Sequence, residues 1–176
     1  MDRKSVARWQ QLQGLTALLD ELPRELCRLG FNSYSFAFSV RAHRLHSSNI
    51  DPGPITQEAL AEVMQPALSH SVNSNSPLLW TASLFADKSR LWDRAQTYGL
   101  RHGWVQPQHS IDAHSHLAIF RPYVVVSSAE MYRKAMWVMW LSERLHQAAT
   151  QLLSKTTDPG NPSHPEMHPC GKYQVR

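Results

Sequence analysis

The chain has 176 residues, with 18 Lys and Arg against 14 Asp and Glu, and a formal net charge of +4. This length allows one domain with a proper hydrophobic core. No run approaches the roughly 20 apolar residues of a membrane span, and the basic, polar N-terminus lacks the apolar segment of a signal peptide. We therefore expect a cytoplasmic protein with no membrane partner. The positive charges are scattered, so they do not by themselves indicate nucleic-acid binding.

The N-terminal third begins with a helical pattern and then changes period. Leucines at helical spacing predict a helix over residues 3–29, which Gly14 and Pro23 are expected to break into pieces. From Phe31 to Val40 apolar and polar residues alternate, which predicts a strand with one buried face. Residues 41–49 are polar and show no clear pattern.

A second helix is predicted after a turn cluster at residues 51–54. It covers residues 57–68 and has one apolar face. The polar residues 69–76 that follow are expected to form a linker.

The strongest signals lie between Pro77 and Pro122. Residues 89–98 have apolar side chains at helical spacing, and Gly99 follows at the place where a helix end often needs a positive φ. A helix that stops at a glycine indicates a sharp reversal of the chain.

Two extended runs follow this helix. Gly103 lacks a side chain and permits close backbone approach. Residues 104–106 begin an extended run that Pro107 is expected to end, and residues 116–120 predict a second one. The helix, the Gly-x-x-x-Gly corner and the two strands are typical of half of an α/β sandwich.

The last predicted helix is the clearest in the chain. Ser127 and Glu130 have capping-box spacing, and apolar residues from Met131 onward repeat on one face. A second apolar set, which includes Trp137 and Trp140, widens this face beyond what one sheet requires. Two interpretations stay open: the helix is deeply buried, or Trp137 and Trp140 form a self-association face.

After Lys155 the composition changes to Pro, Gly, His and polar residues without periodicity. We therefore divide the chain into a domain over residues 1–155 and a linker over residues 156–176.

No constellation for catalysis or metal binding is evident. His114 and His116 would share one face of a strand, but no His-x-x-x-His, carboxylate cluster or Cys-x-x-Cys accompanies them. Neither a nucleophile elbow nor a phosphate-binding glycine loop is present. We expect no cofactor, no metal and no enzymatic activity.

The central stretch resembles the autoinducer-binding domain of LuxR-type quorum-sensing regulators. That family has the ordered run Pro-x-x-Trp, an aromatic-bearing helix, Gly-Leu-x-x-Gly-x-x-x-Pro and a strand ending in Arg. Looser similarity extends from about Leu15 to about Leu153. The matching residues here are Pro77, Trp80, Trp92, Gly99, Leu100, Gly103, Pro107 and Arg121.

The resemblance implies a pocket for an acyl-homoserine lactone between the sheet and a helical layer. In the family a Trp donates to the lactone carbonyl, an Asp accepts from the amide N–H, and a Tyr and a Ser or Thr contact the amide carbonyl. Counted back from Trp80, the family's Asp falls on Gln65, its Trp on Pro52, and two Tyr positions on Ser48 and Thr56. Its strand hydroxyl falls on Ala118.

The pocket therefore looks degenerate, and we expect no tight lactone binding. An apolar wall remains, which we expect to fill the core; a cavity for a different small apolar ligand is the alternative. The residues of this wall are Phe36, Phe38, Trp80, Phe85, Leu91, Trp92, Trp104, Ile119 and Phe120.

The resemblance also implies a fold: a three-layer α-β-α sandwich with a central, mostly antiparallel sheet. The N-terminal and C-terminal helices are expected on one side, and helices 57–68 and 89–98 on the other. The expected function is a dimerising regulatory domain whose DNA contacts come from a C-terminal helix-turn-helix domain that is absent here. The chain is then either an excised domain or a naturally short protein. Alternatives are a sensor of another apolar ligand, or a DNA-free antagonist that forms mixed dimers with related regulators.

Overall fold

The computed structural model describes residues 3–51, 57–156 and 174–175 of the chain. Its centre is an antiparallel sheet with the strand order β3-β4-β5-β1-β2-β6. The strands are β1 (Ser33–Val40), β2 (His43–Ser48), β3 (Leu78–Trp80), β4 (His102–His109), β5 (Ala113–Arg121) and β6 (Gln174–Val175).

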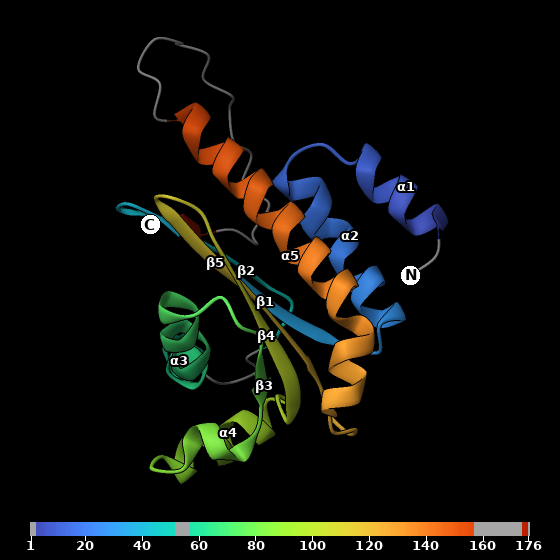
Figure 1. Ribbon diagram of the computed structural model, residues 1–176. Helices are drawn as coiled ribbons and strands as arrows, with labels where there is room; N and C mark the ends of the chain where they lie inside the picture. Colours follow the sequence, from blue (N-terminus) through green and yellow to red (C-terminus); the bar gives the residue numbers. More distant parts are fainter. Residues whose placement is uncertain (1–2, 52–56, 157–173, 176) are drawn as a thin grey trace.

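Helices cover both faces of this sheet (Figure 1). On one side lie α1 (Arg3–Gln11), α2 (Leu15–Arg28) and the long α5 (Ser128–Thr156). On the other lie α3 (Gln57–Asn73), the 3-10 turn η1 (Ala82–Phe85) and α4 (Ser89–Thr97). The predicted three-layer fold and the predicted sides of the helices are confirmed.

The strand pleat divides the apolar residues between two cores. Successive side chains of a strand point to opposite faces, so neighbours on β5 belong to different layers. Leu117 and Ile119 pack in the core beneath α2 and α5, whereas Ala118 and Phe120 pack in the core beneath α3 and α4. Each helical layer therefore has its own buried face of the same sheet.

Three predicted element boundaries in the first half of the chain were wrong. Pro23 lies inside α2, where burial of leucines such as Leu18 and Leu22 outweighs the one backbone hydrogen bond that proline removes. The unpatterned residues 41–49 contain β2, which has few apolar positions to signal a strand. Helix α3 continues to Asn73, so most of the expected linker is helical.

Pro107 does not end its strand. It lies inside β4 opposite His116 of β5, while β3 pairs with β4 only as far as Val105. Beyond that point the described residues give β4 no partner on the β3 side, and a proline is tolerated at such a free strand edge. Gly99 has the expected positive φ of 73° at the end of α4.

The C-terminal segment contains one element that composition did not predict. Gln174 and Val175 form β6, which pairs with His46 and Leu45 of β2. The division into a domain and a linker stays a prediction. In the described part of the chain, no helix is both long and apolar enough to cross a membrane.

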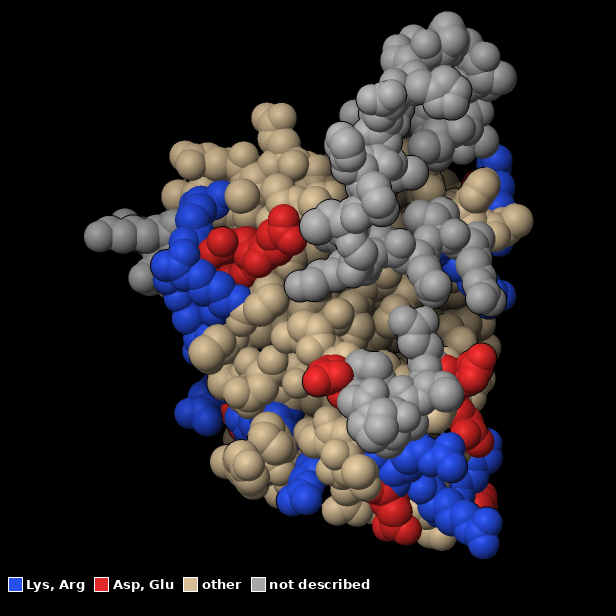
Figure 2. Space-filling model, turned by 180° about the vertical axis from the view of Figure 1, so that it is seen from behind, with Lys and Arg blue, Asp and Glu red and all other residues tan. Residues whose placement is uncertain are grey.

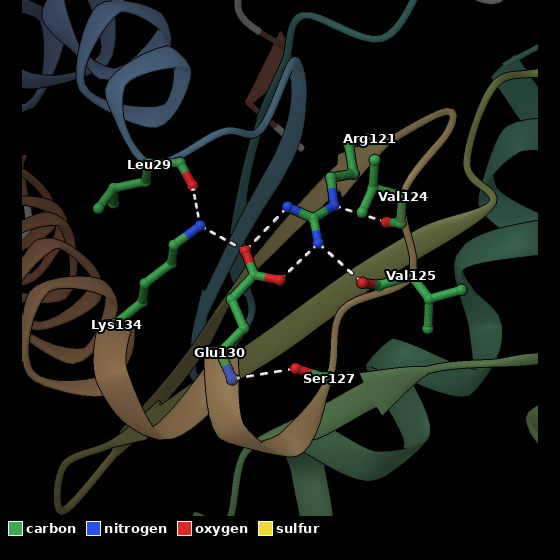
Figure 3. A network of polar contacts seen from close by, with 7 residues as sticks. All are labelled: Leu29, Arg121, Val124, Val125, Ser127, Glu130 and Lys134. Carbon is green, nitrogen blue, oxygen red and sulfur yellow. Dashed lines mark hydrogen bonds and ion pairs between the residues drawn. The ribbon is translucent and has the colours of Figure 1, made fainter.

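A partly buried ion-pair network ties the end of β5 to α5 and α2 (Figure 3). The Arg121 guanidinium makes two hydrogen bonds to the Glu130 carboxylate, at 2.8 and 2.6 Å. It also donates to the carbonyls of Val124 and Val125 at 2.6 and 2.9 Å. The loop between β5 and α5 is therefore held by one side chain.

Lys134 completes the network. Its ammonium donates to Glu130 and to the carbonyl of Leu29, which is 2.5 Å away at the end of α2. Arg121 and Lys134 also lie 5.4 and 5.3 Å from the ring centre of Phe31, within cation–π range. Hydrogen bonds from Arg121, with a smaller contribution from Lys134, lower the pKa of Glu130 from 4.5 to about 2, although burial opposes the shift.

We predict that Glu130→Gln lowers the free energy of unfolding by about 3 kcal/mol at neutral pH, because Arg121 and Lys134 lose a charged partner. The folded-state pKa lies below the unfolded one, so this stabilisation is complete above about pH 4.5 and lost as pH falls towards 2. Urea unfolding across this range measures it. Glu143→Gln, an exposed change on the same helix, should cost little; equal losses in both variants would contradict the prediction.

Candidate functional site

The candidate site is the apolar layer between the sheet and helices α3 and α4. We call it the α3/α4 layer. Its residues come from β3, β4 and β5 on one side and from α3, η1 and α4 on the other. Its buried members are Ile50, Leu60, Val63, Met64, Ala67, Trp80, Phe85, Leu91, Ala95, Leu100, Val105, Ala118 and Phe120.

Trp80 lies at the centre of this layer. Its ring is 5.1 Å from the ring of Phe85 and 5.1 Å from that of Phe120, and both contacts have edge geometry. Its indole Nε1–H donates to the carbonyl of Leu100 at 2.8 Å. Trp80 therefore joins β3 to the segment after α4, and its only hydrogen-bond donor is already used within the protein.

Gly103 makes room for Phe120 on the neighbouring strand. A Cβ at this position would lie 2.6 Å from the carbonyl oxygen of Ile119 and 2.6 Å from the Phe120 ring. The expected close approach at Gly103 is confirmed. Any side chain here would displace Phe120, and with it the ring contact to Trp80.

The structure brings together only part of the predicted apolar wall. Of this wall, Trp80, Phe85, Leu91 and Phe120 lie in the α3/α4 layer, and Trp92 packs at its margin, 5.4 Å from Phe85. Ala118, the predicted hydroxyl position, lies in the layer as well. Trp104 instead lies in the core beneath α2 and α5.

Phe36, Phe38 and Ile119 share that opposite core with Trp104, so nearly half of the predicted wall faces the other side of the sheet. The pleat explains the difference, because Trp104 pairs with Ile119 and thus points to the same face.

Gln65 and Ser48 do not extend into the layer either. Gln65 is exposed on α3, where its amide donates to Ser69 Oγ at 3.3 Å. Ser48 Oγ donates to the carbonyl of Tyr34 and accepts from the N–H of Ile50, so it stabilises the chain where β2 ends. Pro52 and Thr56 lie outside the described residues.

The layer becomes polar at the C-terminal end of α3. Ser71 is completely buried, and its Oγ donates to the carbonyl of Leu68 at 2.9 Å. The Ser71 Oγ also lies 3.1 Å from Nδ1 of His116. The backbone carbonyl oxygen of Ser71 lies 2.5 Å from Nε2 of His109. Burial, reinforced by His46 and His114, lowers the pKa of His116 to about 4.

Sequence reasoning noticed His114 and His116 but missed Ser71. It placed Ser71 in a linker, because the polar residues after Leu68 hide the continued helix. The available signal was the spacing: Ser71 follows Ala67 by four residues and thus shares its buried face.

One polar atom beside the α3/α4 layer has no partner. Among the described side chains, the Tyr98 hydroxyl is buried and makes no hydrogen bond, although the ring packs against the layer. A phenol can both donate and accept. It is thus available to a polar group of a bound molecule.

A polar groove lies outside the layer, between α3 and α4, with a volume of about 610 Å³. Acidic and basic side chains line it together, and Arg94 is paired with Glu62 at 2.8 Å. Figure 2 shows both signs of charge side by side at its lower right, where α4 lies. Residues 3–51, 57–156 and 174–175 contain no group of three or more His, Cys, Asp or Glu that could hold a metal ion.

One stretch of the chain matches a known family. The family model of the autoinducer binding domain matches residues 63–149, which include most of α3, all of α4, β4 and β5, and most of α5. No curated protein sequence matches the chain.

Solved structures show the same fold. CepR2 from Burkholderia cenocepacia, an N-acylhomoserine lactone dependent LuxR family transcription factor, is 16% identical with a TM-score of 0.66, over 82% of this chain and 90% of that one. Escherichia coli SdiA is 20% identical with a TM-score of 0.65, over 93% and 72%. SdiA in complex with octanoyl-rac-glycerol is 18% identical with a TM-score of 0.63, over 93% and 70%.

Residues 63–149 of the chain therefore match the autoinducer binding domain family, and the chain shares the fold of LuxR-family structures.

Proposed function

We propose that this chain is the regulatory domain of a quorum-sensing transcription regulator whose pocket no longer suits acyl-homoserine lactones. The observation that carries the proposal is the composition of the α3/α4 layer. Its buried aromatic and aliphatic members supply one polar group, the Trp80 N–H, which is bonded to Leu100. The buried polar side chains beside them, Ser35, Ser71 and His116, are also bonded within the protein. Ala118, at the position of the family's strand hydroxyl, can neither donate nor accept.

The lactone amide would find no charged acceptor in the described part of this layer. The two buried charged residues of the described chain, Glu25 and Arg121, lie towards α2 and α5 on the other side of the sheet. Gln65, the counterpart of the family's Asp, is exposed. Two or three missing hydrogen bonds, at about 1 to 3 kcal/mol each, would weaken binding by several orders of magnitude.

A second candidate function is the sensing of a different apolar ligand. The unpaired Tyr98 hydroxyl beside the layer favours it. A related structure, that of SdiA, contains octanoyl-rac-glycerol, whose head group is neutral and rich in hydroxyls. A ligand of this chemistry needs no carboxylate partner. A DNA-free antagonist that forms mixed dimers with related regulators remains a further alternative.

Self-association is proposed on the exposed side of α5. Trp137 and Trp140 pack inward, and Trp140 lies 5.9 Å from Trp9 of α1. Their exposed neighbours form a stripe of Tyr132, Met136, Met139 and Glu143.

Successive residues of this stripe are four, three and four positions apart, so the stripe is symmetric about its centre. Two antiparallel copies of α5 would therefore place Met136 against Met139, and the Tyr132 hydroxyl near Glu143.

The lactone proposal predicts a negative result in a thermal-shift screen. A ligand at about 100 µM with a Kd of about 1 µM would stabilise the protein by about 2.7 kcal/mol and raise its Tm by roughly 5 to 10 °C. We expect acyl-homoserine lactones of any chain length to produce no such rise. A lactone-specific rise, confirmed by sub-micromolar affinity in isothermal titration, would overturn the proposal.

The second candidate predicts that octanoyl-glycerol raises the Tm in the same screen. Tyr98→Phe should abolish most of this rise while it leaves the unliganded Tm nearly unchanged, because the hydroxyl has no partner to lose. Tyr123→Phe, an exposed tyrosine on the β5–α5 loop, is the matched control. An equal response of wild type and both variants would argue against Tyr98 as a ligand contact.

The association proposal predicts that Met136→Glu makes the protein monomeric in multi-angle light scattering, because a charge would be buried at the centre of the α5 pairing. Ile111→Glu, a fully exposed apolar position on the β4–β5 turn, should leave the mass unchanged. Met136→Glu is preferable to Trp140→Glu, which would also remove the contact with Trp9. A dimeric Met136→Glu variant would exclude this face.

A further inference from the structure

The sheet face beneath α3 changes from apolar to histidine-rich in regular rows. Strand register places Leu78, Val105 and Ala118 in one row across the sheet, which continues as Ser35 on β1 and Ser48 on β2. This row is apolar from β3 to β5. Two residues further along each strand, the next row contains His46, Ala37, His116 and Pro107.

The row after that contains Arg44, Ser39, His114 and His109. Polarity and basic character thus increase along α3 from its apolar middle to its C-terminal end.

Two of these histidines bind the same residue of α3. His116 of β5 contacts the Ser71 hydroxyl at 3.1 Å, and His109 of β4 contacts the Ser71 carbonyl at 2.5 Å. The Ser71 hydroxyl donates its own proton to Leu68, so it accepts from His116. His116 therefore carries a proton on Nδ1, and burial, which lowers its pKa, favours the neutral form of the ring.

Among the described residues, no carboxylate forms an ion pair with His116. Its side chain is 3% exposed, and the titratable groups that face it are His46 on β2, His109 on β4 and His114 on β5, with the Arg44 guanidinium beside His114.

On α3, the residue that contacts His116 is Ser71. His70, on the same turn of α3, is hydrogen-bonded to the carbonyl of Ser76 instead. The carboxylate at this end of the sheet, Asp112 on the β4–β5 turn, is paired with Arg41 at 3.8 Å. Protonation would therefore bury a positive charge with no carboxylate paired to it among the described residues.

We propose that the His116–Ser71 contact is a pH-sensitive attachment of α3 to the sheet, which mild acidification releases. Release frees the last turns of α3, because Ser71 is the polar anchor that follows Val63, Met64 and Ala67 on the buried face of that helix. The α3/α4 layer then becomes accessible from this end. A fall in pH would therefore ease the entry of a ligand into the α3/α4 layer by releasing the end of α3.

The direction and size of the effect follow from linkage. Burial lowers the pKa of His116 to about 4, against about 6.5 when the site is open. The closed state is therefore favoured fully above pH 6.5 and loses ground as pH falls towards 4. One such group increases the open population about tenfold between pH 7.5 and 5.5.

Hydrogen exchange followed by mass spectrometry tests the proposal. After correction for the intrinsic pH dependence of exchange, peptides from the last turns of α3 should lose about tenfold in protection between pH 7.5 and 5.5. Peptides from residues 131–141 of α5 should not. His116→Asn keeps a donor near Ser71 but cannot titrate, so its α3 protection should be independent of pH.

His70→Asn is the matched control, because it removes a histidine from the same turn of α3 without touching His116. It should retain the wild-type response. If His116→Asn does not fold, NMR titration of the wild type decides: the His116 ring should stay neutral down to about pH 5, and its titration should coincide with shifts of the Leu68 and Ser71 amides. Titration of His116 near pH 6.5, or α3 protection that does not depend on pH, would overturn the proposal.

Discussion

The structure depends on the double burial of β5, the central strand of the described sheet. Eight of its nine residues are buried, and helices cover it on both sides. Since side chains alternate across a strand, each apolar residue of β5 contributes to one layer and not to the other. Residues paired across strands point to the same face, so the strand register extends this division over the sheet. The division determines which aromatic residues surround the candidate site.

The division of side chains between the two faces of the sheet explains why fewer aromatic residues line the candidate site than the sequence predicts. The α3/α4 layer receives Trp80, Phe85 and Phe120, while Trp104 and the phenylalanines of β1 stabilise the opposite core. Within the layer, the contact between the rings of Trp80 and Phe120 depends on the absence of a side chain at Gly103, because a Cβ there would clash with Phe120. A regulatory role built on this layer therefore works through shape and apolar contact more than through fixed polar partners.

Polar interactions operate instead at the two ends of β5. At its C-terminal end, Arg121 fixes the loop to α5 and leaves Tyr123, Val124 and Val125 exposed near the stripe proposed for self-association. At the other end, His116 holds α3. The two ends therefore connect the candidate ligand layer with a candidate partner surface through a single rigid strand, which offers a physical route by which one can influence the other.

Much of the fold was predictable from local patterns. The helix of residues 89–98, the positive φ of Gly99, the close approach at Gly103 and the capping of α5 by Ser127 all follow from short-range chemistry. The family resemblance predicted the three-layer arrangement and the side of the sheet on which each helix lies, and the structure confirms both.

The membership of the site was not predictable in the same way. Gln65 is exposed, Trp104 faces the other core, and Pro107 stays within a strand because β3 ends before it. Ser71 looked like part of a linker until its contact with His116 showed that α3 continues. Local sequence determined the elements because their signals lie within a few residues. Only the tertiary structure decided which faces meet, because that depends on strand register and on partners up to 105 residues away in the sequence.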